Sequence, residues 1–164
     1  MLTLEQMVIR LTIALALGAV IGLERELVGK EAGIRTEILV AGGAAIFSIV
    51  SITLPYIVAV SSANLPDVVA RNSGFLGMAA NVVVGIGFLG AGIIIKTSDS
   101  HVRGLTTAAV IWATAAVGVL VGVGLISMAV ISALLMTGLL YALRKVDIYK
   151  RLRPTGFLDG ENGE

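Results

Sequence analysis

The stretch that decides the fold is GIGFLGAG at Gly85–Gly92, followed after a short polar segment by VRGLTTAAVIWATAA at Val102–Ala116. The first is glycine-dense inside a long apolar run, and the second begins near an arginine and continues as an apolar, threonine-containing segment. A membrane-spanning helix needs about 20 largely apolar residues, and each stretch lies in a run of about that length. Together they predict two membrane helices joined by a short polar loop.

The composition of the whole chain favours a membrane protein. Of the 164 residues, 57% are hydrophobic and 14% are charged, against about 45–50% and about 25% in soluble domains. A chain of this size has too little interior to hide so much apolar surface from water. It has no cysteine and one histidine, His101, so disulfides and thiolate chemistry are excluded and imidazole chemistry is limited. Glu5 lies in the N-terminal segment, so we expect no cleavable signal there.

Three further apolar segments complete the predicted fold, an all-α polytopic transmembrane bundle of about five spans. The predicted spans are Gln6–Leu23, Glu37–Val60, Gly74–Ile95, Leu105–Val121 and Leu125–Leu143. Ten of the twelve lysines and arginines fall on one side of these spans. Cytoplasmic loops carry the excess of basic residues, so the N-terminus is predicted outside and the C-terminus in the cytoplasm. Residues 1–143 would form the transmembrane domain and residues 144–164 a basic cytoplasmic tail.

The glycines Gly85, Gly87, Gly90 and Gly92 are predicted to serve helix packing. They include a G-x-G-x-x-G pattern, but a dinucleotide site needs a preceding strand and a following soluble helix, which a membrane-length apolar run does not offer. Small residues instead let membrane helices approach closely. A locally broken, ligand-lining helix is the alternative. Asn81, in the same run, either makes an interhelical hydrogen bond or lines a polar cavity.

Charged residues gather at the predicted cytoplasmic side. Acidic and basic residues alternate over Glu24, Arg25, Glu26, Lys30, Glu31, Arg35 and Glu37. Ionisable groups near membrane depth tend to face a bundle interior or water, so this alternation indicates a paired network at a cytoplasmic mouth; a solvated flank is the alternative. Arg103 precedes Thr106, Thr107 and Thr114 at a spacing that places Arg103, Thr107 and Thr114 on one helix stripe, with Trp112 on the opposite side. The basic run from Arg144 is expected to orient the chain and attract anionic lipid.

Four blocks, in order, resemble the MgtC/SapB family of bacterial inner-membrane proteins. They are GLERE at Gly22–Glu26, K-x-A-G-x-R-T at Lys30–Thr36, GIGFLGAG at Gly85–Gly92 and VRGLTTAA-x-x-WATAA-x-G at Val102–Gly118. The chain resembles the short form without a C-terminal ACT-like domain. The resemblance implies functional roles at the matching positions Glu24, Arg25, Lys30, Arg35, Thr36, Arg103, Thr106, Thr107 and Trp112.

The resemblance implies a multi-pass protein of the bacterial inner membrane, linked to low-magnesium adaptation and virulence. We expect a non-enzymatic regulator that binds other membrane proteins such as the ATP synthase. A transporter or channel for magnesium or another cation, using Glu24, Glu26 and Asn81, is the alternative. We expect a homo-oligomer, with a dimer favoured, that lies in the lipid bilayer and binds no nucleic acid. No cofactor or catalytic residue is predicted, and a metal site is left open.

Overall fold

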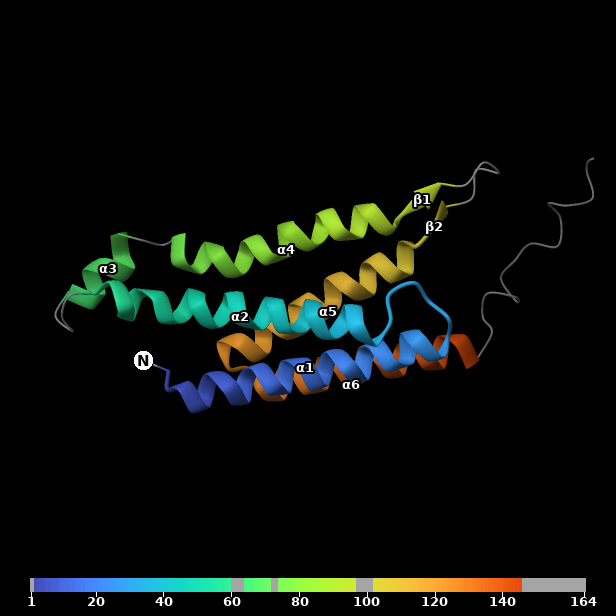
Figure 1. Ribbon diagram of the computed structural model, residues 1–164, viewed down its shortest axis with the longest axis horizontal. Coiled ribbons are helices and arrows are strands. Elements are labelled where there is room, and N and C mark those ends of the chain that lie inside the picture. The colour runs from blue at the N-terminus through green and yellow to red at the C-terminus, as the bar shows by residue number, and fades with distance from the viewer. Residues whose placement is uncertain (1, 60–63, 72–73, 97–101, 146–164) are drawn as a thin grey trace, which may run out of the picture.

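The structure is a computed structural model that describes residues 2–59, 64–71, 74–96 and 102–145. They form a bundle of helices (Figure 1). The elements are α1 (Leu4–Leu27), α2 (Ile34–Val58), α3 (Leu65–Arg71), α4 (Gly74–Ile93), β1 (Ile95–Lys96), β2 (Val102–Arg103), α5 (Leu105–Val123) and α6 (Ile126–Lys145). Helices α1, α2, α5 and α6 are long and apolar enough to cross a membrane, and α4 is apolar over Gly77–Ile93. The predicted all-α transmembrane bundle is confirmed.

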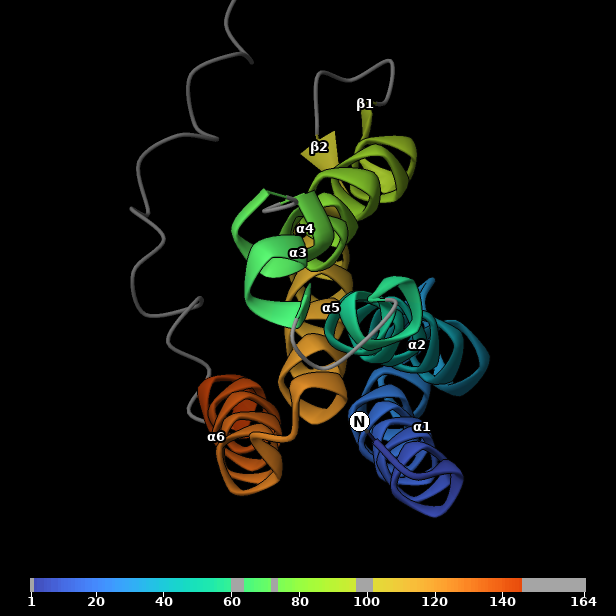
Figure 2. The same cartoon turned by 90° about the vertical axis from the view of Figure 1, so that its left-hand side faces the viewer.

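Helix α5 occupies the centre of the bundle. Viewed along the long axis, α4 lies above α5, α2 and α1 lie to its right, and α6 lies below and to the left (Figure 2). The closest pairings are α1 with α2 and α2 with α5, whereas α6 packs only lightly on α5 and α1. A compact core of α1, α2 and α5 is therefore flanked by α4 on one side and α6 on the other.

One end of the bundle gathers most of the charged residues, and we call it the charged end. It holds the α1–α2 connection, the β1–β2 ladder and the C-terminal end of α6, while the N-terminus and α3 lie at the opposite end (Figure 1). The charged end therefore includes Arg25, Lys30, Arg35, Arg103 and Arg144, which the sequence placed together on one side of the predicted spans. The side of the membrane that this end faces stays a prediction. His101 and most of the predicted cytoplasmic tail lie outside the described residues.

Helix α2 is held to its two neighbours by glycines that allow backbone contact. A Cβ atom on Gly18 of α1 would lie 2.5 Å from the carbonyl oxygen of Glu37. On α5, a Cβ atom on Gly118 would overlap the carbonyl oxygen of Ala41, and one on Gly122 would lie 2.5 Å from the Cβ atom of Ser48. Close approach through small residues is the main way in which membrane helices gain packing energy. These glycines therefore form the packing surface of the core.

The four glycines predicted from the sequence to serve helix packing lie on α4, away from this packing surface. Only Gly90 contacts another helix within the described chain, with its Cβ position 3.5 Å from the Cβ atom of Ala108 on α5. At Gly85, Gly87 and Gly92, an added Cβ atom would have nothing within 4 Å. Helix α4 runs unbroken through all four, so the alternative of a locally broken helix does not describe it.

The connections differ from the expected ones in detail. Helix α1 continues to Leu27, which makes Glu24, Arg25 and Glu26 helical residues and not a flank. The loop expected after Ile95 begins and ends in a short antiparallel ladder that pairs Ile95 with Arg103. Two-residue strands carry no hydropathy period, so the sequence offered no signal for them.

Arg10, placed by the sequence inside the first span, binds the end of α5. Its Nη1 donates a hydrogen bond of 2.7 Å to the carbonyl oxygen of Gly122. Helix α5 ends there with Gly124 in the left-handed conformation at a φ of 99°. The last carbonyls of a helix lack partners within it and carry partial negative charge, so a cation at that point is stabilising. Arg10 thereby joins α1 to α5 at the end opposite the charged end.

Replacing Gly118 by alanine tests the glycine-packed core. The added methyl group would overlap the Ala41 carbonyl oxygen of α2, so we expect the variant to be less stable by roughly 1–3 kcal/mol, the usual cost of overpacking. Gly87→Ala is the matched control, because nothing lies within 4 Å of its Cβ position and alanine favours a helix. The measurement is the thermal midpoint in detergent, followed through the fluorescence of Trp112. Equal midpoints for the two variants would contradict the packing assignment.

Candidate functional site at the charged end

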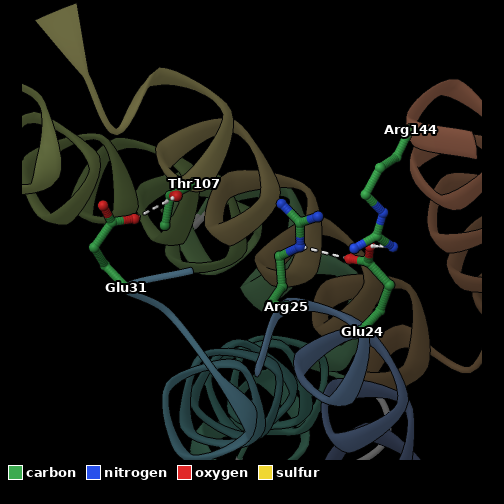
Figure 3. A network of polar contacts seen from close by, with 5 residues as sticks. All are labelled: Glu24, Arg25, Glu31, Thr107 and Arg144. Atoms are coloured by element: carbon green, nitrogen blue, oxygen red, sulfur yellow. Dashed lines mark hydrogen bonds and ion pairs between the residues drawn. The ribbon is translucent and has the colours of Figure 1, made fainter. Parts of the chain in front are cut away.

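Segments far apart in the sequence meet at the charged end. The connection after α1 reaches the first turn of α5, and the last turn of α6 reaches the end of α1 (Figure 3). The contacts that join them are polar and run through Glu24, Glu31, Thr107 and Arg144. Three of the four sequence blocks therefore come together in space at one end of the bundle.

Glu24 is the centre of an ion-pair group. Its Oε2 accepts a hydrogen bond of 2.6 Å from Nε of Arg25, and its Oε1 accepts one of 2.7 Å from Nη2 of Arg144. The Glu24 and Arg25 side chains are 10% and 5% exposed, whereas that of Arg144 is 41% exposed. The Arg144 guanidinium also lies 5.7 Å from the centre of the Tyr141 ring. Glu24 thus ties α6 to α1, which otherwise pack lightly.

Glu26 stabilises the start of α2. Its Oε2 accepts a hydrogen bond of 3.0 Å from the backbone N–H of Ile34. The N-cap residue of α2 is Gly33, which has no side chain to cap the helix, so Glu26 satisfies a donor that would otherwise lack a partner. A Cβ atom on Gly33 would lie 2.7 Å from that same carboxylate oxygen. The glycine leaves room for the carboxylate, and a negative charge suits a helix N-terminus.

Glu31 joins the α1–α2 connection to α5. The Thr107 hydroxyl donates a hydrogen bond of 3.0 Å to Oε2 of Glu31, and Thr107 itself is buried. A hydrogen bond to its own backbone, followed by the Thr107 bond, lowers the pKa of Glu31 below its ordinary value of 4.5. Lys30 and Arg103 act in the same direction through their charge. Glu31 was part of the predicted alternation but not of the predicted site.

A second polar group lies deeper, between α1, α2 and α5. Arg25 is 4% exposed, and Glu37 and Thr114 are fully buried. Arg25 Nη1, both carboxylate oxygens of Glu37 and Thr114 Oγ1 have no hydrogen-bond partner among the described residues. Buried polar groups without partners are costly, so this group is the least satisfied part of the core. Glu37 belonged to the predicted acid–base alternation and is the first residue of the second predicted span, and the seven-residue spacing from Thr107 was the signal for Thr114.

The other predicted site residues are exposed or partly exposed. Lys30, Arg35, Arg103 and Thr106 are exposed around the charged end, and Thr36 is half-buried beside them. No described hydrogen bond or ion pair joins Arg103 to Glu24 or Arg25, so Arg103 is not joined directly to that pair. The positive charge of Arg103 instead acts on Glu31, where it lowers the pKa of the carboxyl.

Two predicted site residues lie away from the charged end. Asn81 of α4 faces a groove between α2 and α4. Trp112 is 51% exposed and lines a shallow groove between α5 and α6. Within residues 2–59, 64–71, 74–96 and 102–145, no three histidine, cysteine or acidic side chains gather in a way that would hold a metal ion.

The protein is a small bundle of membrane-length helices that pack through glycines in the core and carry a charged face at one end. These features define a polytopic membrane protein. The chain belongs to the MgtC family, whose sequence pattern matches residues 11–149.

Curated relatives agree with this assignment. Protein MgtC of Brucella abortus is 46% identical over 119 residues, covering 73% of this chain and 43% of the relative. Protein MgtC of Salmonella typhimurium is 44% identical over 117 residues, covering 71% and 43%. An uncharacterised protein of Haemophilus influenzae is 40% identical over 127 residues, covering 77% and 51%. The chain spans about half the length of these relatives. No solved structure matches the chain.

A double-mutant cycle tests the ion-pair group. We expect Glu24→Gln and Arg144→Gln to couple by about 0.5–1 kcal/mol in the free energy of unfolding, since one partner is solvent-exposed. The same cycle between Glu24→Gln and Arg103→Gln should be additive, because no described contact joins those side chains. Urea or mild-denaturant unfolding in detergent supplies the midpoints. Coupling to Arg103 in place of Arg144 would show that the ion pairs are differently arranged.

The Glu31–Thr107 bond predicts a pH-dependent effect. A carboxylate with a lowered pKa contributes stability that is full above its ordinary pKa and is lost as the pH falls through the lowered value. Thr107→Val should therefore lower the thermal midpoint at about pH 7, and the difference from wild type should shrink below the ordinary pKa of 4.5. Thr106→Val, which changes an exposed neighbouring hydroxyl, is the control. A difference that is the same at all pH values would refute the assignment.

Proposed function

We propose that this protein is a regulator in the bacterial inner membrane, linked to low-magnesium adaptation and virulence, that acts by binding other membrane proteins such as the ATP synthase. The observation that carries the proposal is the convergence of three family blocks on one exposed polar face. Lys30, Arg35, Arg103 and Thr106 are exposed on that face, and the Glu31–Thr107 bond holds the blocks together. Exposed residues on a rigid support suit recognition of a partner.

The packing beneath this face favours binding over transport. Between the buried polar group and the opposite end, α2 and α5 meet through Gly118 and Gly122, with Ala41, Ala45 and Val117 filling the core. Backbone contact at these glycines leaves no room for a hydrated ion to pass between the two helices. The charged end has no nucleophile–base pair among the described contacts, so we propose a non-enzymatic role.

A cation transporter or channel is the second candidate, and one observation favours it. Glu37 is fully buried beside Thr114 and Arg25, and neither of its carboxylate oxygens makes a hydrogen bond of ordinary geometry among the described residues. Buried carboxylates are a feature of ion and proton paths in membranes. The residues that the sequence suggested for that path have other partners or surroundings. Glu24 is ion-paired, Glu26 binds a backbone N–H, and Asn81 lies in the apolar groove between α2 and α4. Glu37 is therefore the residue on which a transport function would depend.

We also propose a homodimer as the working form. Gly87 and Gly92 have open space around them, and Val84 and Phe88 on the same helix are 74% and 83% exposed. An apolar helix face with small residues is suited to contact with a second membrane helix. The molar mass of the purified protein in detergent tests this proposal, and a monomer at all concentrations would exclude it.

The regulator proposal predicts a measurable effect on the ATP synthase. In inverted membrane vesicles, the wild-type protein should reduce ATP-driven proton pumping and should co-purify with the synthase. Arg103→Glu should weaken both effects by roughly tenfold, as expected for reversal of an interface charge, whereas Lys145→Glu, at the same end but outside the family blocks, should not. Magnesium flux into liposomes is measured on the same preparations. Flux that is lost in Glu37→Gln, with pumping unchanged, would reject the regulator in favour of the transporter.

A further inference from the structure

One amide on α4 lies at membrane depth without a partner. Asn81 is exposed, and no hydrogen bond joins its side chain to any residue that the structure describes. It stands seven residues after Gly74, the first residue of the 20-residue α4, and so about 10 Å along a helix that rises about 1.5 Å per residue. The α2 residues that line the groove beside it, Gly43, Ala44 and Phe47, lie near the middle of α2. Asn81 is therefore inside the apolar part of the bundle and not at its ends.

An amide at that depth needs a hydrogen-bond partner. Lipid tails offer neither donors nor acceptors, so an unpaired amide is costly there. Long cationic side chains can reach the membrane surface from within the bilayer, but the short side chain of Asn81 cannot. Amides in membranes instead hydrogen-bond across neighbouring helices. Because the described part of the chain supplies no such partner to Asn81, we look for it on another molecule.

Glycines flank this amide by one helical turn on each side. Gly77 and Gly85 stand four residues before and four residues after Asn81, and a Cβ atom on either glycine would have nothing within 4 Å. Residues three or four apart share one face of a helix, and Phe88 continues this face with 83% exposure. We call Gly77, Asn81, Gly85 and Phe88 the amide face of α4. Glycines let a second helix approach closely, and a short amide can reach a partner only at such a distance.

We propose that the amide face of α4 packs against the same face of a second copy, with the two Asn81 amides hydrogen-bonded to each other. This inference rests on the homodimer proposed above and specifies its contact. Copies of one chain insert with the same orientation, which their basic residues set, so the two-fold axis of a dimer runs along the membrane normal. The two α4 helices are then parallel, and each residue meets its own counterpart at the same depth.

The chemistry of the amide favours a second copy over a different protein. An asparagine side chain carries two N–H donors and a carbonyl acceptor, so two Asn81 side chains satisfy each other and need no third group. Asn81 and Gly85 also line the groove between α2 and α4, and the second α4 would therefore lie along the opening of that groove. Helix α4 keeps its own contact with α5 through Gly90, which lies outside the amide face.

Cysteine cross-linking in membranes tests this geometry, and the chain suits it because it has no cysteine of its own. Phe88→Cys leaves the amide in place and should give a disulfide-linked dimer on mild oxidation, since the two copies of position 88 face each other. Val83→Cys is the matched control. Val83 is also exposed, at 37%, but it stands two residues after Asn81 and so on the opposite side of a helix with 3.6 residues per turn. Equal linking of the two variants would overturn the parallel contact.

Asn81→Leu tests the amide itself, because leucine has a similar size and makes no hydrogen bond. The dissociation constant of the dimer, measured in lipid bilayers by energy transfer between labelled copies, should rise roughly tenfold, as expected for loss of interhelical hydrogen bonds in a membrane. Asn81→Gln restores an amide and should restore association. The thermal midpoint followed through Trp112 in dilute detergent should match that of the wild type in both variants, since Asn81 has no described partner in its own chain.

The outcomes separate this contact from the homodimer itself. A wild type that dimerises and an Asn81→Leu variant with the same dissociation constant would overturn the Asn81 contact and place the dimer interface on another face. A wild type that stays monomeric in bilayers at all concentrations would remove the homodimer and this contact together.

Discussion

The structure depends on the approach of α2 to its two neighbours at the distance of backbone contact. In lipid, apolar side chains gain nothing by leaving their surroundings, so helices associate through packing and polar contacts. Gly18 on α1 and Gly118 with Gly122 on α5 remove the side chains that would hold the helices apart. This contact determines where the first turn of α2 lies, and therefore places Glu37 inside the core.

The placement of Glu37 inside the core has a cost in desolvation free energy. Arg25 and Glu37 are almost completely removed from solvent, and several of their polar atoms lack partners among the described residues. Removing charge from water costs several kcal/mol per ion unless hydrogen bonds replace the lost hydration. The polar group beneath the charged face therefore carries a desolvation cost inside a tightly packed core.

Two sides of the bundle differ in how completely they close. Toward α1 and α5, α2 is in backbone contact at Gly18, Gly118 and Gly122, whereas an apolar groove that Arg35 also lines lies between α2 and α4. The closed side gives a fixed support for the exposed residues of the family blocks.

Helix positions and the separation of charge to one end could be predicted from the sequence, because hydropathy and the placement of lysine and arginine are local properties of the chain. For the same reason the sequence could predict site residues such as Glu24, Arg25 and Thr107, and their place in the family blocks supported that prediction. The sequence could not show which glycines pack against another helix, because Gly18 and Gly85 cannot be told apart until the neighbouring helix is known. The partner of Glu24 is Arg144, 120 residues away, and only the tertiary structure brings them together. The sequence by itself therefore determined the class of protein and its charged end, whereas three-dimensional packing decided which polar groups are buried, which are paired and which remain available to a ligand.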